Sequence, residues 1–264
     1  DGHSIGEDVY IAHCPERVLP GRILIELVEN DRVVGGINES STAVTVEFYE
    51  RFVRGAVLAT TAKTAEMVKL TENSSRDVQI AFANELSMVC ETETINTWEV
   101  IELANRHPRV NILQPGPGVG GHCIAVDPWF IVDRSPECSN LIRTAREVND
   151  AKPGWVIERV KRCADKFKSP VIACLGLAFK ADVDDLRESP ASDIVKKLQE
   201  KNIGQLMVCE PNLKAHKDFE LCSLELAIKQ ADIILLLVDH KSFKKLSAAE
   251  LGEKVVIDTR GVIR

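Results

Sequence analysis

The sequence predicts an α/β protein in which a long central helix is followed by a parallel sheet with helices on both faces. Three observations predict this architecture. After Pro170, short apolar runs alternate with helical segments in a β-α-β-α-β-α-β order, which is typical of a parallel sheet. The run Ile233–Val238 is apolar at every position, as expected for a strand buried on both faces. A helical pattern free of Gly and Pro extends from about Thr64 to Glu91.

The parallel part is expected to begin near Lys168 to Pro170, where the character of the chain changes. Short apolar runs bounded by turn residues predict its strands, and amphipathic stretches predict its helices. The strands are expected at 171–175, 205–209, 233–238 and 254–258, and the helices at 190–201 and 224–230.

The first half of the chain mixes short extended segments with helices. Strands are expected at 9–14, 31–36 and 57–61, and further helices at 97–105 and 139–166. Ser40 or Ser41 is expected to cap a helix that runs to about Val53. Pro153 falls inside the 139–166 stretch and marks either a break or a helix start.

The segment 109–128 breaks all periodicity and predicts a loop. Within it, Gly116–Gly121 matches the G-x-G-x-x-G pattern, which binds a pyrophosphate when it joins a strand to a helix. Pro128 disfavours a helix through Asp127, and no acidic residue ends a second strand about twenty positions on. The pattern therefore does not indicate a Rossmann fingerprint. Its glycines allow the backbone to approach either a bound sugar or tightly packed neighbours.

The charge balance restricts the kinds of partner. With 33 basic and 40 acidic residues, the net charge of −7 argues against general affinity for nucleic acid or for an anionic membrane surface. A local basic pocket for a phosphate remains compatible with it. The apolar runs are too short to span a bilayer, and the first residues carry no apolar signal segment. These features predict a cytoplasmic protein.

The eight cysteines argue against a metal or disulfide framework. None belongs to a C-x-x-C pair, so a zinc ribbon or a thioredoxin-type site is disfavoured and no metal is expected. For a chain of this length, the pattern predicts a reducing compartment with mostly buried, inert thiols.

Cys123 is the cysteine with the greatest chemical interest, because it lies in the glycine-rich loop next to His122. A loop position gives a thiolate access to substrate, and flanking amides stabilise an oxyanion. A buried structural thiol is the equal alternative. His122 is disfavoured as its base, since adjacent side chains in an extended loop point apart.

A polar stripe lies along the long helix. Glu66, Lys69, Asn73 and Asp77 share one face at spacings of three and four residues. Taken alone, the stripe favours a solvated face with an ion pair. Alternatively, Lys69 and Asn73 present an ammonium and an amide to an alkoxide or carbonyl oxygen.

Five motifs in sequence order resemble those of the nucleotide-sugar dehydrogenases, the UDP-glucose/GDP-mannose dehydrogenase family. The motif 118–130 resembles the loop of the catalytic cysteine, and 66–73 resembles the motif of the central helix. The others resemble the segment of the family's acidic residue, its C-terminal nucleotide-sugar motif and its closing strand. These lie at 14–21, 176–190 and 258–261.

The resemblance implies three parts. Residues 1–61 correspond to the end of an NAD-binding domain, 62–168 to a central helical dimerisation domain, and 169–264 to a Rossmann-like UDP-sugar-binding domain. We expect a piece on the order of 100–150 residues to be missing before the first part. Because that piece carries the amides for the NAD pyrophosphate, we expect the chain alone to be a poor catalyst or none. We also expect an exposed, sticky or poorly ordered edge around residues 1–60.

The resemblance also indicates the substrate. His122 before the cysteine and the sequence from Ile124 to Trp129 are similar to the N-acetylhexosamine branch, with UDP-N-acetyl-D-mannosamine as substrate. Val126 stands where UDP-glucose dehydrogenases carry a lysine. Oxidation of UDP-N-acetylglucosamine, or a non-catalytic fragment for UDP-sugar binding or dimerisation, are the alternatives.

The implied reaction is an NAD-dependent four-electron oxidation of the sugar at C6 to a uronate, in a homodimer. Cys123 forms a thiohemiacetal and then a thioester, which water hydrolyses. Lys69 and Asn73 hold the oxyanion or a water, Asp127 orients the site, and Glu16 acts as general base or binds water. The implied substrate-binding residues are Arg109 (toward the neighbouring subunit's sugar), Gly120, His122, Lys180 and Arg260, and Arg187 is the implied NAD-binding residue.

Overall fold

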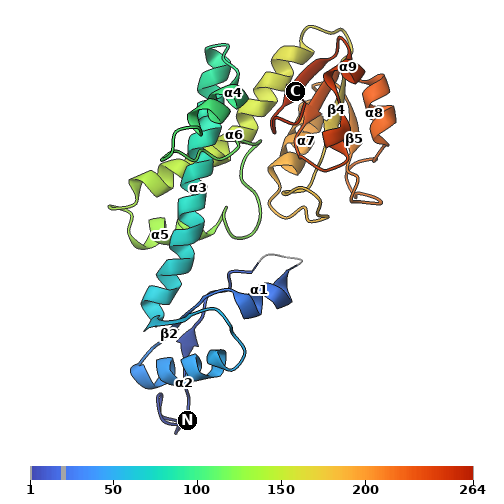
Figure 1. Cartoon of the computed structure of the whole chain (residues 1–264). Coiled ribbons are helices and arrows are strands. Elements are labelled where there is room, and N and C mark those ends of the chain that lie inside the picture. Colours follow the sequence, from blue (N-terminus) through green and yellow to red (C-terminus); the bar gives the residue numbers. More distant parts are fainter. Residues whose placement is uncertain (1, 19–21, 264) are drawn as a thin grey trace. The chain divides into compact units, whose positions relative to one another are not determined.

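The computed structural model describes residues 2–18 and 22–263 (Figure 1). The chain divides into two compact units, one ending at Ser74 and the other beginning at Ser75. The last three residues of the predicted motif 14–21 fall outside the described residues. The three-part division at residues 61 and 168 stays a prediction.

The first unit contains a sheet in the order β1-β2-β3. β2 (Arg32–Gly36) and β3 (Val57–Thr61) confirm the strands predicted at 31–36 and 57–61, and they pair in parallel. β1 (Ala12–His13) pairs with β2 in the antiparallel sense. β1 is much shorter than the predicted strand 9–14. The helix α1 (Ile23–Glu29) was not predicted.

The helix α2 (Glu39–Glu50) begins one residue before the predicted caps. Its N-cap is Asn38, whose backbone is extended and whose side chain accepts a hydrogen bond from the Ser41 N–H at 2.8 Å. The prediction of Ser40 or Ser41 as the cap is therefore wrong. Both serines already lie inside the first turn, where their hydroxyls are too far along the chain to cap it.

The predicted long helix is α3 (Ala62–Thr92), which continues from the first unit into the second. It is followed by α4 (Thr97–Ala104), α5 (Asp127–Arg134) and α6 (Asn140–Ala164). The predicted loop thus ends earlier than expected. Pro128 lies in the first turn of α5, where a missing N–H costs no helical hydrogen bond, and so it does not exclude a helix that starts at Asp127.

Proline does not break α6. The helix passes through Pro153, which is buried, so neither a break nor a helix start occurs there. A buried polar network joins α6 to α3. Arg146 Nη1 contacts Asp77 Oδ1 at 2.6 Å, and Asn149 Nδ2 donates to the same oxygen at 2.8 Å. Asp77 is therefore fully buried rather than part of a solvated stripe.

The second unit ends in the predicted parallel sheet. Its order is β5-β4-β6-β7, and every neighbouring pair is parallel. Its strands are β4 (Val171–Leu175), β5 (Gln205–Cys209), β6 (Ile233–Leu236) and β7 (Val255–Asp258). Its helices are α7 (Pro190–Glu200), α8 (Leu224–Gln230), α9 (Ala248–Leu251) and a 3₁₀ turn at Phe243–Lys245.

Alternate residues of the strands fill two apolar cores. On one face, Ile172 and Leu235 pack with apolar side chains of α6 and α7. On the other face, Leu175 and Ile234 pack with α8, Phe243 and Leu251. Figure 1 shows α7 and α8 on opposite sides of the sheet. Burial on both faces explains why β4 and β6 are apolar at every position.

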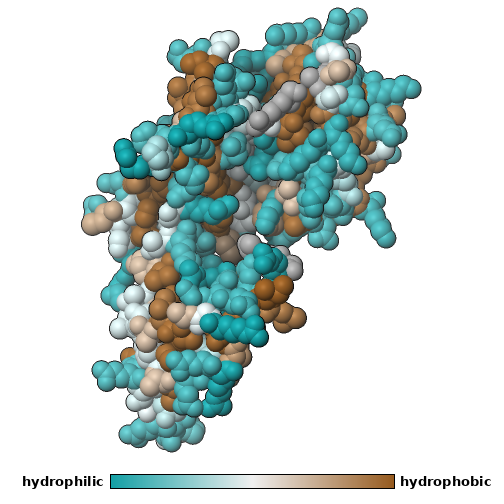
Figure 2. Space-filling model, in the orientation of Figure 1, coloured by the Kyte–Doolittle hydropathy of each residue, from teal (hydrophilic) through white to brown (hydrophobic). Residues whose placement is uncertain are grey.

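The surface carries a mixture of polar and apolar side chains (Figure 2). Leu103 and Leu141 are among the large exposed apolar residues. No helix in the described part of the chain combines the length and the apolarity needed to cross a membrane. All eight cysteines are free, but only Cys90, Cys174 and Cys209 are buried, so the expectation of mostly buried thiols is wrong.

Candidate active site

A cavity opens at the carboxyl ends of the parallel strands in the second unit. Between β4 and β6 the chain order reverses, since β5 lies on one side of β4 and β6 on the other. Ligands of doubly wound folds bind at this kind of switch point. The lining includes Pro117, Gly118, Phe179, Lys180, Pro190 and Arg260. Pro190 begins α7, so the positive end of that helix dipole faces the cavity, as suits a phosphate.

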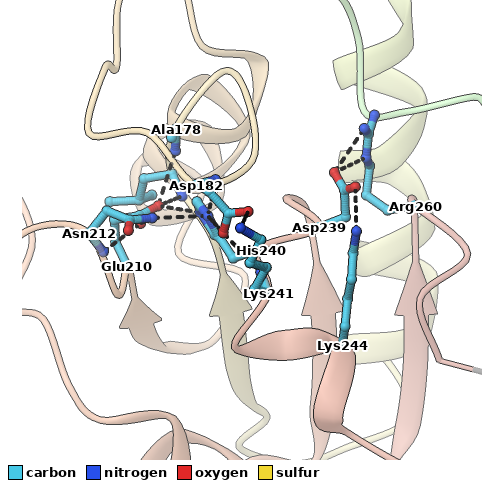
Figure 3. Close-up of polar contacts among 10 residues, drawn as sticks. Ala178, Asp182, Glu210, Asn212, Asp239, His240, Lys241, Lys244 and Arg260 are labelled. Carbon is cyan, nitrogen blue, oxygen red and sulfur yellow. Dashed lines mark hydrogen bonds and ion pairs between the residues drawn. The ribbon is translucent and has the colours of Figure 1, made fainter. Parts of the chain in front are cut away.

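The structure brings two of the predicted substrate-binding residues, Lys180 and Arg260, to this cavity, although 80 positions separate them. Arg260 is held by Asp239, with its Nε 3.0 Å and its Nη2 2.9 Å from Asp239 Oδ1 (Figure 3). Burial alone would raise the pKa of Asp239, but the Arg260 and Lys244 cations more than offset it and hold that pKa below its ordinary value. An ionised Asp239 therefore orients the guanidinium.

The glycine-rich loop packs tightly against this region. A Cβ at Gly120 would lie 2.3 Å from the Glu188 carbonyl oxygen, and one at Gly116 would lie 2.5 Å from Arg260 Nη1. Gly121 has a φ of +85° and lies against the Phe179 ring. Tight packing therefore accounts for these glycines. The loop lies between α4 and α5 and does not join a strand to a helix, in agreement with the rejection of a Rossmann fingerprint.

Cys123 lies in the turn that leads into α5. Its carbonyl oxygen accepts hydrogen bonds from the N–H groups of Val126 and Asp127, at 3.0 and 2.8 Å. This turn places Asp127 in the first turn of α5. Cys123 and Asp127 are half-buried, and His122 is exposed.

Arg187 shares this region with Cys123. Its guanidinium grips Asp185, with Nη2 2.6 Å and Nε 3.0 Å from the carboxylate oxygens. These hydrogen bonds lower the pKa of Asp185 to about 2 and raise the pKa of Arg187. A smaller electrostatic contribution to the raised pKa of Arg187 comes from Cys123, so the two groups lie within electrostatic range of one another.

Three further predicted residues lie in the first unit. Lys69 and Asn73 lie on α3 and are half-buried, and Glu16 follows β1. Glu16 Oε1 accepts hydrogen bonds from the N–H groups of Arg17 and Val18 and from Arg32 Nη1, at 2.7, 3.0 and 3.2 Å. Burial raises the pKa of Glu16, but these donors outweigh it and lower that pKa below its ordinary value.

Arg109 lies in the second unit, exposed, between α4 and the glycine-rich loop. No group of three or more His, Cys, Asp or Glu side chains within residues 2–18 and 22–263 is placed to hold a metal ion.

Sequence reasoning missed several buried charged residues. Arg32 fixes Glu16, and Glu210 and His240 lie at the strand ends beside the cavity. A second cavity of about 230 Å³, between α3, α4 and α6, is lined by Lys152. Burial lowers the pKa of Lys152 to about 8. The positions of Glu210 and His240 in the sequence could have indicated them. Glu210 directly follows the predicted strand 205–209, and His240 lies two residues after the predicted strand 233–238, at the strand ends where ligands of parallel sheets bind.

Comparison with known proteins agrees with this arrangement. Three domain models of the UDP-glucose/GDP-mannose dehydrogenase family match the chain in order. The NAD binding domain matches residues 1–53, the central domain 63–151 and the UDP binding domain 173–264. Lys180 and Arg260 lie in the region of the last of these, and Pro117 and Gly118 of the same cavity lie in the region of the central domain.

Individual relatives belong to the same group. An NDP-N-acetyl-D-galactosaminuronic acid dehydrogenase of Ralstonia nicotianae is 60% identical over 266 residues, covering 98% of this chain and 63% of the relative. A UDP-N-acetyl-D-mannosamine dehydrogenase of Yersinia pestis is 52% identical over 270 residues, covering 97% and 64%.

The fold agrees as well. The solved UDP-D-ManNAc dehydrogenase of Pyrococcus horikoshii superposes with a TM-score of 0.89 at 40% identity, covering 100% of this chain and 64% of that one. The chain thus spans less than two thirds of the length of these relatives. Three domain models of one family match in chain order, and relatives at 52–60% identity cover nearly the whole chain. The chain therefore belongs to the UDP-glucose/GDP-mannose dehydrogenase family.

Proposed function

We propose that this chain provides the nucleotide-sugar site and the catalytic cysteine of an NAD-dependent dehydrogenase that oxidises C6 of UDP-N-acetyl-D-mannosamine to the uronate. The observation that carries the proposal is the cavity where Lys180, Arg260 and the N-terminus of α7 converge. Two cations and a positive helix end in one cavity match the charge of a diphosphate. Gly120, which packs beside Phe179, and His122 complete the substrate side of this site.

The roles of the catalytic residues follow from their chemistry. Oxidation of the C6 alcohol, with loss of a hydride and a proton, yields an aldehyde. The Cys123 thiolate then adds to the aldehyde carbon, so that a thiohemiacetal holds the intermediate on the protein. A second loss of a hydride and a proton gives a thioester, and attack by water breaks the C–S bond to release the carboxylate and the thiol.

The remaining groups act on charge and water. The Lys69 ammonium and the Asn73 amide are donors suited to an oxyanion or a bound water, and Asp127 orients the groups around Cys123. Glu16 suits a base that accepts a proton from the attacking water, because its hydrogen bonds keep it ionised.

NAD fits the residues beside Cys123. Arg187 has a side chain that is 66% exposed, lies within electrostatic range of the thiol and is held by Asp185, so it presents a fixed cation to a dinucleotide phosphate. When bound, NAD accepts the hydride of each oxidation.

We also propose a homodimer in the cytoplasm. Phe82 and Val89 are more than half exposed on one face of α3, Arg109 is free to reach a neighbouring subunit's sugar, and the free cysteines suit a reducing setting.

A second sugar is favoured by one observation. The relative named for N-acetyl-D-galactosaminuronic acid is 60% identical, against 52% for the Yersinia pestis enzyme named for the mannosamine. UDP-N-acetyl-D-galactosamine is therefore the second candidate. Phosphate and uracil contacts are shared by both sugars, so only the sugar contacts distinguish them.

Calorimetric titration of the full chain tests the proposal. UDP-N-acetyl-D-mannosamine is titrated first, and UDP-N-acetyl-D-galactosamine and UDP-N-acetylglucosamine follow in separate runs. Lys180→Met is expected to weaken binding at least tenfold, because it removes a charge-assisted contact to the diphosphate, worth about 1.5–3 kcal/mol. Lys229→Met on α8 is the matched control, since Lys229 is equally exposed but remote from the cavity lining. A failure of all three nucleotide sugars to bind would contradict the proposed function.

The role of Cys123 needs a separate experiment. Iodoacetamide is expected to modify Cys123 in the unliganded chain, and the nucleotide sugar that binds is expected to slow this modification. Cys138, which is exposed, serves as the internal reference whose rate stays constant. Equal rates at Cys123 with and without bound sugar would remove it from the substrate site.

A further inference from the structure

A buried pair of side chains, Glu210 and His240, lies beside the nucleotide cavity without lining it (Figure 3). Glu210 follows β5 and His240 lies just beyond β6, so both belong to the carboxyl edge of the sheet. His240 Nε2 lies 3.1 Å from Glu210 Oε2, and both side chains are at most 1% exposed. None of the proposed catalytic steps uses this pair.

Glu210 holds the beginning of the loop that follows β4. Its Oε2 accepts hydrogen bonds from the N–H groups of Leu177 and Ala178, at 2.7 and 3.1 Å. The Leu177 carbonyl oxygen, on the opposite side, accepts hydrogen bonds from Ser189 Oγ and Ser192 Oγ, at 2.6 and 2.9 Å. The Leu177 backbone is therefore fixed through both its N–H and its C=O.

His240 holds the far end of the same loop. The Asp182 N–H donates to His240 Nδ1 at 2.9 Å, and the Lys241 N–H donates to Asp182 Oδ1 at 3.0 Å. Because Nδ1 accepts a hydrogen bond, the imidazole is neutral with its proton on Nε2, which donates to Glu210. Asp182 has a φ of +60°, a conformation that a residue with a side chain rarely adopts without such support.

Between the two fixed ends lie Phe179 and Lys180, which line the cavity. Phe179 also supports the Gly120–Gly121 backbone. A loop with an exposed lysine and a residue at positive φ would otherwise have many conformations, and the ordering entropy would weaken any ligand that needs one of them.

We propose that Glu210 and His240 are positioning residues of the nucleotide site, which hold residues 177–182 in the conformation that presents Phe179 and Lys180 to the ligand. The expected effect on nucleotide affinity rests on the proposed function. The expected effect on the conformation of residues 177–182 does not. The burial of Glu210 raises its pKa, but the His240 hydrogen bond and the backbone N–H groups outweigh this and hold that pKa below its ordinary value. The carboxylate oxygens accept five hydrogen bonds, which suits the ionised form.

Two readouts on the full chain test the proposal, namely the Kd for UDP and amide hydrogen exchange. Glu210→Gln replaces one acceptor oxygen by an NH₂ donor, which meets hydrogen-bond donors at either position. Leu177, Ala178 and His240 donate to Oε2, and the Asn212 N–H and Nδ2 donate to Oε1. We expect exchange to accelerate at Leu177, Ala178 and Asp182 but not at the β6 amides of Ile234 and Leu235. The Kd for UDP is expected to rise at least tenfold.

Variants of His240 separate the contact of Nε2 with Glu210 from the contacts of Nδ1 with Asp182 and Asn212. His240→Phe removes all three hydrogen bonds at similar volume and is expected to weaken UDP binding as strongly as Glu210→Gln. His240→Asn offers an amide oxygen near the position of Nδ1, and we expect it to restore part of the affinity and the slow exchange at Asp182. A purely structural role would not distinguish the Phe variant from the Asn variant.

Two controls separate positioning from general instability. Glu253→Gln removes an exposed carboxylate of the same domain and is expected to change neither readout. Leu198→Ala removes part of a fully buried side chain in α7, and is expected to lower the unfolding midpoint while leaving the Kd for UDP within twofold. If Leu198→Ala, at equal loss of stability, weakens UDP binding as much as Glu210→Gln, the positioning role is overturned.

The experiments distinguish a failure of the positioning role of Glu210 and His240 from a failure of the proposed function. If the unsubstituted chain does not bind UDP, the proposed function fails, and the exchange data still decide whether Glu210 and His240 hold the loop. If UDP binds and the folded Glu210→Gln and His240→Phe variants keep its Kd within twofold, the positioning role is wrong.

Discussion

At the scale of single residues, the structure shows that the buried Arg32 guanidinium lowers the pKa of the predicted acidic residue Glu16. Arg32 is only 2% exposed, and its guanidinium contacts Glu16 and the Leu27 carbonyl oxygen at 3.2 Å each. Nothing in the spacing of the sequence indicated this residue, because Arg32 lies in a strand whose other side chains are small or apolar. Its role depends on a contact across 16 positions.

Arg32→Met is expected to raise the pKa of Glu16, because it removes the cation and one hydrogen bond that favour the carboxylate. A carboxyl ¹³C titration by NMR measures this directly. Arg54→Met is the control, since Arg54 pairs with the exposed Glu29 at 3.0 Å and does not contact Glu16. If the pKa of Glu16 is the same in Arg32→Met and in the unsubstituted chain, the backbone N–H groups of Arg17 and Val18 alone keep it ionised.

At the scale of elements, the glycine-rich loop and α6 carry glycines with opposite requirements. Gly120→Ala is expected to cost about 1–3 kcal/mol of unfolding free energy, because the new methyl group would meet the Glu188 carbonyl oxygen at 2.3 Å. Gly154→Ala is expected to stabilise the chain by about 0.5–1 kcal/mol, because Gly154 lies inside α6 with open space around its Cα. Denaturant unfolding measures both. Similar effects of the two substitutions would show that the loop relaxes away from residue 188.

The cap of α2 provides a test of the same kind. Asn38→Ala is expected to cost about 1 kcal/mol, because the Ser41 N–H loses its acceptor. Asn38→Asp keeps an acceptor oxygen and is expected to preserve most of the stability. Ser40→Ala, at a cap position that the sequence had suggested, is expected to change stability by less than about 0.5 kcal/mol. A larger loss for Ser40→Ala than for Asn38→Ala would contradict the observed cap.

At the scale of the whole molecule, the buried carboxylates make stability depend on pH. The pKa values of Glu210 and Asp239 lie below their ordinary values of 4.5 and 3.8. The folded state therefore binds fewer protons than the unfolded state in acid. The stabilisation is present above these ordinary values and is lost as the pH falls through the lower folded values. Asp77 has the opposite sign, since burial raises its pKa and its protonation is easier in the folded chain.

We expect the free energy of unfolding to fall with pH below about 4.5, the ordinary pKa of Glu210. Asp239→Asn is expected to flatten part of this slope, because it removes one carboxyl that must be protonated on unfolding. Urea unfolding at pH 3, 4, 5 and 7 measures the slope, with Glu253→Gln as the exposed control. An unchanged slope in Asp239→Asn would show that other groups dominate the acid transition.

The site residues were predicted from motifs that resemble those of the family, and their roles stay predictions. The sequence by itself determined the order of the parallel strands and helices after residue 170 and the long central helix. These depend on local spacing, because the period of apolar residues selects helix or strand within about ten positions. Short features were less predictable. The strand predicted at 9–14 is only Ala12–His13 in the structure, and the sequence did not predict α1 or the start of α5. Segments this short contain too few residues to show a helical or strand period.

Only the tertiary structure decided which charges are buried and what they face. Crossovers between parallel strands bring Lys180 to Arg260 and Glu210 to His240, and the packing of α6 on α3 buries Asp77 against Arg146. Such pairings depend on strand order and helix rotation over distances of 30 to 80 residues, which local pattern does not specify. The close packing of Gly120 likewise depends on the tertiary structure, because the Glu188 carbonyl oxygen that it contacts is placed there by the folded sheet.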